Sequence, residues 1–334
     1  MLKWGIFLCA LFFFLLFIRN TDVRKIMAEL QQVGLRFFVL ILVTFIAYFW
    51  GVLGWRFCMG KSGAQISVAR LFAVRHVSET IGILNPAGVV GVEAMKVYLL
   101  RSYGIPTSKL LSSIVLSRVI MVVSQLILFV LITLLCWHKG LRSFLPVKTG
   151  VWSSSSLVYA VCILTVILFF VFLFKSSYRT NTDNFIGRQI RTVRDRSAAI
   201  RKEMQHVLFR KKQMAYSFLS FVLHWIFGAF EFYMILRLLK VDVSIGEGML
   251  VDLGVMFFKA AGFFVPGQLG IEEYGNKIML SAIGIHDESV WLTASVLRRA
   301  RQICWILLAA LLYFVLLHTR KHSTRPDGGI IYKP

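Results

Sequence analysis

Charged residues are scarce in this chain of 334 residues, of which 16% are Asp, Glu, Lys or Arg and 57% are hydrophobic. A soluble globular domain carries about 25% charged residues. The shortage of charge and the excess of apolar residues exclude a soluble domain and predict an all-α polytopic membrane protein. We expect residues 1–334 to form a single transmembrane domain.

Acidic residues and paired cysteines are also few. Against 38 Lys and Arg stand only 16 Asp and Glu, which gives a formal net charge of +22. No basic stretch is interleaved with aromatic residues for base stacking, so we expect the positive charge to meet an anionic membrane surface rather than nucleic acid. None of the five cysteines lies in a C-x-x-C pair and no histidines have metal-ligand spacing, so we expect no disulfide framework, no metal and no other cofactor.

Six apolar runs predict membrane crossings, since a helix needs about 20 apolar residues to span a bilayer. They are Trp4–Ile18, Phe37–Trp55, the C-terminal part of Lys109–Cys136, Leu157–Phe174, Ala215–Leu239 and Ile303–His318. The first is short and resembles a signal peptide, but "RNTD" follows it in place of a small-residue cleavage site, so we expect a retained crossing. Two further regions, Ala69–Arg101 and Glu247–Ile285, are apolar but interrupted by Pro, Gly and charge. We expect these two to be re-entrant broken helices.

Basic residues predict the orientation of the chain. Residues 175–213 are rich in Lys and Arg, and the tail at 319–334 is basic as well. The positive-inside rule places both segments in the cytoplasm, and counting the crossings backwards places the N-terminus there too. One group of basic residues would then face outward, against the rule: Arg19, Arg24, Lys25 and Arg36. The expected location is the cell membrane, inner or plasma, with a multi-pass chain and both termini cytoplasmic.

The two broken regions carry similar sequences, "NPAGVVGVEAMK" at residues 85–96 and "VPGQLGIEEYGNK" at residues 265–277. Further matches follow in the same order, and the offset grows only from 179 between Gly91 and Gly270 to 181 between Arg118 and Arg299. Ordered matches at a nearly constant offset predict an internal duplication, with halves at about 1–136 and 153–318. Each half contains three crossings, so the second half enters from the opposite side. The sequence therefore predicts an inverted repeat whose broken helices meet near the membrane midplane.

Charged residues lie in or beside both broken regions, although a charge at the bilayer centre costs about 2.5–3.5 kcal/mol on insertion scales. In one interpretation Glu93 and Glu272 pair with Arg118 and Arg299 and pin the broken elements in place. In the other, the same cavity holds a polar substrate, with arginines on a phosphate and glutamates on an amine. Both interpretations stay open. The candidate cavity residues are Asn85, Pro86, Gly91, Glu93, Arg118, Lys259, Pro266, Gly267, Gly270, Glu272, Glu273, Arg298 and Arg299.

Three stretches, "ILNPAGVVGVEAMKVYLL", "GIPTSKLLSSIVLSR" and "FFVPGQLGIEEYG…GI…SVLRR", are similar to the lysylphosphatidylglycerol synthase transmembrane, or flippase-like, family. The resemblance covers about residues 35–318. The more specific motif is Pro-Gly-x-Leu-Gly-x-x-Glu, which is supplied here by Pro266, Gly267, Leu269, Gly270 and Glu273. The first motif departs from the family pattern Gly-Gly-Glu, because Val92 stands in place of the second Gly.

The resemblance implies lipid translocation or the handling of cell-envelope lipids. It does not imply aminoacyl transfer, since the soluble transferase domain of the full synthases needs hundreds more residues. The chain has no P-loop and no Ser-His-Asp motif, so we expect no enzymatic activity, and transport that is passive or ion-coupled. The alternative is a non-catalytic membrane partner or scaffold of an envelope lipid or glycan enzyme. The expected partners are membrane lipids, with an anionic or aminoacylated phospholipid as the candidate substrate. An envelope-biosynthesis enzyme and a second copy of the chain stay open as further partners.

Overall fold

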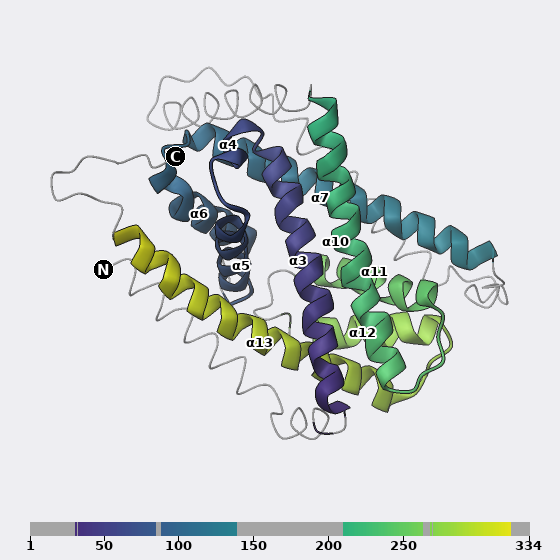
Figure 1. Cartoon of the computed structure of the whole chain (residues 1–334). Helices are drawn as coiled ribbons and strands as arrows, with labels where there is room; N and C mark the ends of the chain where they lie inside the picture. The colour runs from purple at the N-terminus through teal and green to yellow at the C-terminus, as the bar shows by residue number, and fades with distance from the viewer. Residues whose placement is uncertain are drawn as a thin grey trace, which may run out of the picture.

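A computed structural model of the chain describes residues 33–84, 88–138, 210–262 and 270–321, together with Gln31 and Gln268. All regular structure in these residues is helical (Figure 1). The predicted crossings Trp4–Ile18 and Leu157–Phe174 lie outside the described residues, as does the basic segment up to residue 209.

Four helices of the described part are long and apolar enough to cross a membrane. They are α3 (Phe37–Cys58, preceded by the 3-10 turn η1 at Gly34–Arg36), α7 (Thr107–His138), α10 (Lys211–Leu238) and α13 (Glu288–Lys321). These helices contain four of the six predicted crossings. Helix α13 begins well before the predicted start at Ile303, because the charged residues at 298–301 pair inside the protein and do not mark the end of a helix.

Large apolar side chains remain exposed along the long helices, as expected of surfaces that face lipid. Such side chains include Leu35, Phe38 and Leu42 near the start of α3, Ile127, Val130, Leu131, Leu134 and Leu135 on α7, Tyr216 and Leu219 on α10, and Leu307, Leu311, Phe314 and Val315 on α13. A soluble protein would bury faces of this size. Their exposure therefore agrees with the membrane crossings that the composition predicts.

Helices α3 and α10 form the central pair and run antiparallel (Figure 1). Ser217 Oγ donates to the Gly54 carbonyl oxygen at 2.9 Å, and His224 Nδ1 lies 2.7 Å from the Ala47 carbonyl oxygen, so residue numbers rise along α10 as they fall along α3. A Cβ at Gly54 would lie 2.8 Å from the Phe221 ring. Small residues let transmembrane helices approach closely, and this glycine seats the aromatic ring between the two helices.

The two broken regions are pairs of shorter helices. The first pair is α5 (Val68–Leu84) and α6 (Gly88–Leu100), and the second is α11 (Ile245–Ala261) and α12 (Ile271–Ala282). Short connecting helices lie at α4 (Lys61–Ala64) and η2 (Arg101–Tyr103). The longest members of the pairs have 17 residues, or about 25 Å at 1.5 Å per residue, which is short of the roughly 30 Å hydrocarbon core.

The second pair folds back on itself as a helical hairpin. Ile271, at the start of α12, packs where a Cβ at Gly262 would lie, just after the end of α11. One turn deeper Gly275 lies against Phe258, and deeper still Met279 packs against Gly254. Close contacts at three successive levels show that α11 and α12 run antiparallel, which supports the expectation that this region is not a simple span.

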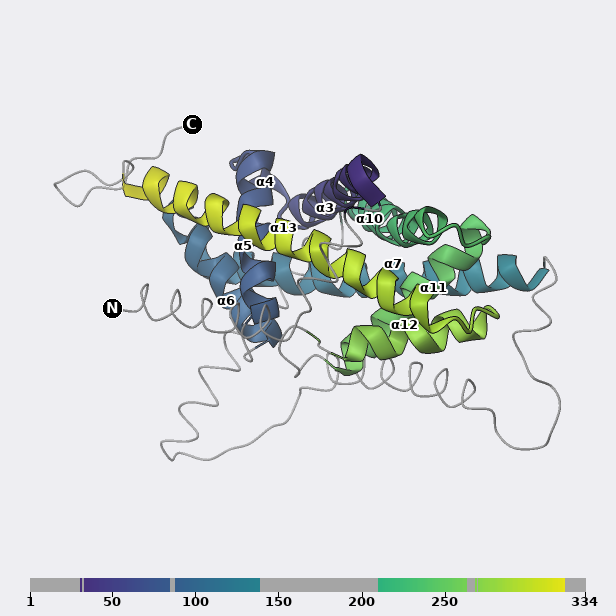
Figure 2. The ribbon, with the colours of Figure 1, turned by 90° about the horizontal axis from the view of Figure 1, so that it is seen from below.

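Helices α5 and α6 also pack against each other, and we term α5–α6 the first hairpin and α11–α12 the second hairpin. Each hairpin packs against a long helix from the other half of the chain. Helix α5 lies beside α13, and α11 lies beside α7. Figure 2 shows α13 extending from the α11–α12 hairpin at one end, past α5, and on toward the C-terminus of the chain. Across the α5–α13 contact, His76 Nε2 lies 2.9 Å from the Trp305 carbonyl oxygen. This arrangement brings the charged residues of both hairpins into the protein interior.

Candidate functional site

Five charged side chains meet between the first hairpin and α7, and we term them the first charged cluster. Arg75 and Glu79 come from α5, Glu93 and Lys96 from α6, and Arg118 from α7. Arg75 Nε lies 2.9 Å from Glu79 Oε1, Lys96 Nζ lies 3.2 Å from Glu93 Oε2, and Arg118 Nε donates to Glu93 Oε1 at 2.8 Å. Three basic groups face two carboxylates, so the cluster has an excess of one positive charge.

The first charged cluster is closed around itself. The Lys96 ammonium lies 5.4 Å from the centre of the Trp55 ring, and a Cβ at Gly51 would collide with the Arg75 guanidinium. The cavity among these side chains is about 10 Å³, which is the space for about one water molecule. This cavity is too small to hold a lipid headgroup.

A second charged cluster joins the other hairpin to α13. It consists of Asp252 and Lys259 from α11, Glu272 and Glu273 from α12, and Arg298 and Arg299 from α13. Arg298 pairs with Asp252, and its Nε lies 3.2 Å from Glu272 Oε1, while Lys259 Nζ lies 3.4 Å from Glu272 Oε2. The side chains of Arg298 and Asp252 are only 3% and 1% exposed. Three basic and three acidic groups balance one another here.

One further ion pair lies beside the second cluster and connects α10 with α13. Arg301 donates to Glu231 Oε2 at 2.7 Å, and the Glu231 side chain is fully buried. The pair is balanced in charge, so the second cluster and this pair together hold four basic and four acidic groups. Of the two clusters, only the first has an excess of positive charge.

The spacing of the Pro-Gly-x-Leu-Gly-x-x-Glu motif has a local structural reason. Gly270 stands immediately before α12 in the left-handed region, with φ at 80°. Its N–H donates to Glu273 Oε2 at 2.9 Å, while Arg299 donates to the other oxygen of the same carboxylate. A glutamate three residues into a helix is the position from which its side chain reaches back to cap the helix start. Glu273 thus fixes the beginning of α12 and ties it to α13.

Gly270 does not serve a close contact within the described residues, since none of their atoms lies within 4 Å of a Cβ placed at Gly270. The glycine is needed because an L-residue in the left-handed conformation is strained.

The predicted ion pairs are partly confirmed. Glu93 pairs with Arg118 as predicted, but the prediction that Glu272 pairs with Arg299 is wrong in its choice of glutamate. The ion pair of Arg299 is with Glu273, and Glu272 pairs with Arg298. Neighbouring residues on an α-helix point about 100° apart, so two adjacent glutamates reach different partners.

Four members of the clusters were not among the predicted cavity residues, namely Arg75, Glu79, Lys96 and Asp252. The spacing of Arg75 and Glu79 by four residues inside an apolar region was a usable signal, since such residues share a helix face. Among the candidates that were named, Asn85, Pro86, Pro266 and Gly267 lie outside the described residues, and Gly91 lies within α6. Within the described residues, no group of His, Cys, Asp and Glu is placed to hold a metal ion.

Four long apolar helices with lipid-facing side chains and two buried charge clusters define a multi-pass integral membrane protein. The family described as the lysylphosphatidylglycerol synthase TM region matches residues 2–316. The chain belongs to this family, which confirms the resemblance seen in its motifs. The comparisons with curated proteins and with solved structures gave no match.

Proposed function

We propose that the protein moves a phospholipid or a lipid-linked envelope molecule across the membrane by alternating access of two inverted halves. The observation that carries the proposal is that both halves hold an ion pair in the same place in the topology, Glu93 with Arg118 and Glu273 with Arg299, although Glu273 is one residue past the repeat counterpart of Glu93. Each pair joins the second helix of a hairpin to the long helix that follows it. Corresponding broken helices with charged groups near the midplane are typical of secondary transporters.

The directions of the long helices support an inverted relation between the halves. Trp305 Nε1 of α13 donates to Thr44 Oγ1 of α3 at 3.1 Å, and Leu297 shares a buried core with Phe37, so α13 runs in the direction of α3. Helix α3 is itself antiparallel to α10, its counterpart in the proposed repeat. The antiparallel run of α3 and α10 is the relation that an inverted repeat requires of counterparts, and the shared direction of α3 and α13 is consistent with it.

The excess positive charge of the first cluster favours a substrate with an anionic phosphate. Arg118 is the most exposed of its three basic side chains, at 29% against 5% for Lys96 and 7% for Arg75. The planar guanidinium of Arg118 suits two parallel hydrogen bonds to phosphate oxygens. A phosphate that replaces Glu93 on Arg118 would release the first hairpin from α7. Substrate binding would thereby be coupled to opening of the closed cluster.

The proposed orientation places residues 175–213 and the C-terminal tail on the cytoplasmic side of the cell membrane. Single cysteines at Ser197 and Ser323 test this by labelling with a membrane-impermeant thiol reagent. Both positions should become accessible only after the membrane is opened. Labelling of the two positions from opposite sides would contradict the orientation.

A second candidate function is a non-catalytic scaffold for an envelope-biosynthesis enzyme. The small volume of the cavity in the first cluster favours it, because ion pairs closed around about 10 Å³ also suit a purely structural pin. Under either function we propose that the chain itself catalyses no reaction. The scaffold and the transporter differ in one measurable property, the movement of lipid by the purified protein.

The test is the flip rate of fluorescent phospholipids with different headgroups, measured in liposomes per correctly folded protein. Arg118→Lys and Arg299→Lys keep the positive charge but lose the planar guanidinium that can form two parallel hydrogen bonds. The flip rate should fall by about 10- to 100-fold, because a charge-assisted hydrogen bond contributes about 1.5–3 kcal/mol. Arg237→Lys is the matched control, because Arg237 forms an exposed pair with Asp242 at the end of α10. Wild-type protein that moves no lipid under any ion gradient would overturn the transporter and favour the scaffold.

A further inference from the structure

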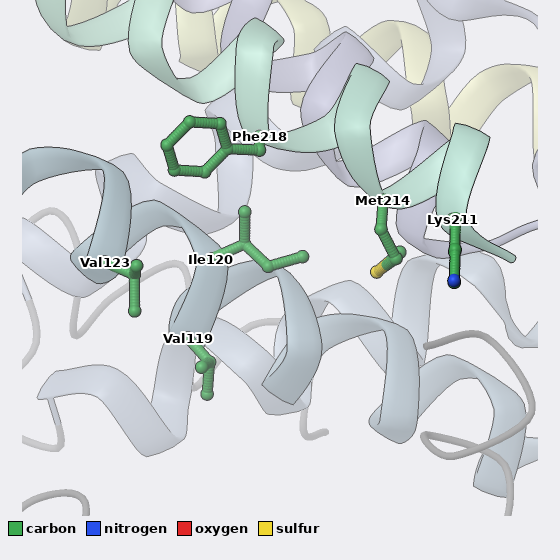
Figure 3. A pocket seen from close by; sticks show the side chains of 6 residues that line it. All are labelled: Val119, Ile120, Val123, Lys211, Met214 and Phe218. Atoms are coloured by element: carbon green, nitrogen blue, oxygen red, sulfur yellow. The ribbon is translucent and has the colours of Figure 1, made fainter. Parts of the chain in front are cut away.

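A groove of about 380 Å³ lies between α7 and α10, outside both charged clusters. It is lined by Val119, Ile120 and Val123 of α7 and by Lys211, Met214 and Phe218 of α10. Figure 3 shows Ile120 pointing from α7 toward α10, and Met214 and Lys211 pointing from α10 toward α7. Five apolar side chains and a single cation therefore form what we term the α7–α10 groove.

We propose that the α7–α10 groove binds one acyl chain of an anionic phospholipid and that Lys211 holds the phosphate of the same lipid. A volume of about 380 Å³ lies in the range of sites that bind small molecules, and at about 30 Å³ per water-sized group it has room for roughly a dozen methylenes. Helix α10 begins at Lys211, so this ammonium lies where the apolar span ends and lipid phosphates are found.

The dimensions of the groove fit a lipid that lies along the helix. Lys211, Met214 and Phe218 follow one face of α10 over about 10 Å at 1.5 Å per residue. The cation is at the helix start and the apolar side chains continue into the span. This order of charge and apolar surface matches the order of phosphate and acyl chain in a phospholipid.

Charge decides which lipid the groove retains. Lipid tails are as apolar as the groove, so the apolar lining alone gains little over the surrounding bilayer. Lys211 supplies the positive charge among the lining residues of the groove, and the start of a long helix adds positive potential. One basic residue near a membrane surface favours an anionic lipid by about 1 kcal/mol, or about 5-fold. The selected class is therefore an anionic rather than a zwitterionic phospholipid.

The same turns of α7 separate the groove from the first charged cluster. Ser117, Arg118 and Met121 line the cavity of that cluster. Their neighbours Val119, Ile120 and Val123 line the groove. A lipid in the groove thus lies one helix away from Arg118. The docking site itself does not rest on the proposed transport, and its test below requires no lipid movement.

The experiment places the photoreactive residue benzoylphenylalanine at Val123, in nanodiscs with equal amounts of phosphatidylglycerol and phosphatidylcholine. The mass of the adduct identifies what occupies the groove. The matched control carries the same residue at Leu131, which lies two turns further along α7 and is 51% exposed. Phosphatidylglycerol adducts should exceed phosphatidylcholine adducts about 5-fold at Val123, and the two should be about equal at Leu131.

Three variants test the contacts. Lys211→Ala should remove the preference at Val123, and Lys212→Ala should keep it, because Lys212 does not line the groove. Ile120→Trp should fill the groove and abolish lipid adducts at Val123. Equal labelling by both lipids, or a preference that survives Lys211→Ala, would overturn the proposal. So would an adduct with residues 139–209 or with a second copy of the chain, which would identify that segment or copy as the occupant.

Discussion

Removing one partner of the Glu231–Arg301 pair should destabilise the protein more than removing both. The pair joins α10 to α13 at 2.7 Å, with Glu231 fully buried and Arg301 13% exposed. Together with the second charged cluster it makes four basic and four acidic groups in one region. Glu231→Gln or Arg301→Gln alone leaves one uncompensated charge there, which costs about 3–5 kcal/mol in a protein interior.

The double substitution restores the balance of charge, so its cost should fall below that of either single change. The expected coupling is then at least about 3 kcal/mol, the size of one uncompensated buried charge. The free energy of unfolding is measured for wild type, both single variants and the double variant by denaturation in mixed micelles. Melting temperatures of the same four proteins give an independent ranking.

The control for this cycle combines Arg301→Gln with Asp242→Asn, which forms an exposed pair with Arg237 after the end of α10 and shares no ion-pair partner with Arg301. Distant sites without shared partners add within about 0.5 kcal/mol. Strict additivity of Glu231→Gln and Arg301→Gln would refute the reasoning, because it would mean that neither side chain depends on the other.

Two further predictions use the same unfolding measurement. Gly270→Ala should cost about 1–2 kcal/mol because of the left-handed conformation, whereas Gly228→Ala, in the middle of α10 with no described atom within 4 Å of the new Cβ, should stabilise by about 0.5–1 kcal/mol. Equal effects of the two changes would argue against backbone strain at Gly270. In a second cycle, Glu273→Gln with Arg299→Gln should be strongly non-additive, and Glu272→Gln with Arg299→Gln should show the smaller coupling. A larger coupling of Arg299 with Glu272 than with Glu273 would contradict this prediction and identify Glu272, the partner expected from the repeat, as the partner of Arg299.

Hydropathy and local spacing predicted much of the secondary structure. Long apolar runs become helices because no water in the hydrocarbon core can satisfy a free backbone group. The two regions interrupted by Pro, Gly and charge became helix pairs too short to span. Local caps also follow from spacing alone: Ser244 and Glu247 form a capping box at the start of α11, and Gly270 and Glu273 begin α12. Each of these features depends on residues within a few positions of one another.

Only the tertiary structure decided which charges meet. The match between "GVE" and "GIE" predicted Glu272 as the partner of Arg299. The rotation of α12 relative to α13 instead places Glu273 against Arg299. Asp252 finds its arginine 46 residues away, and Glu231 finds its arginine 70 residues away. An ion pair forms only where two side chains converge within a few ångströms. Convergence over such separations depends on helix packing and rotation, which hydropathy and motif spacing do not encode.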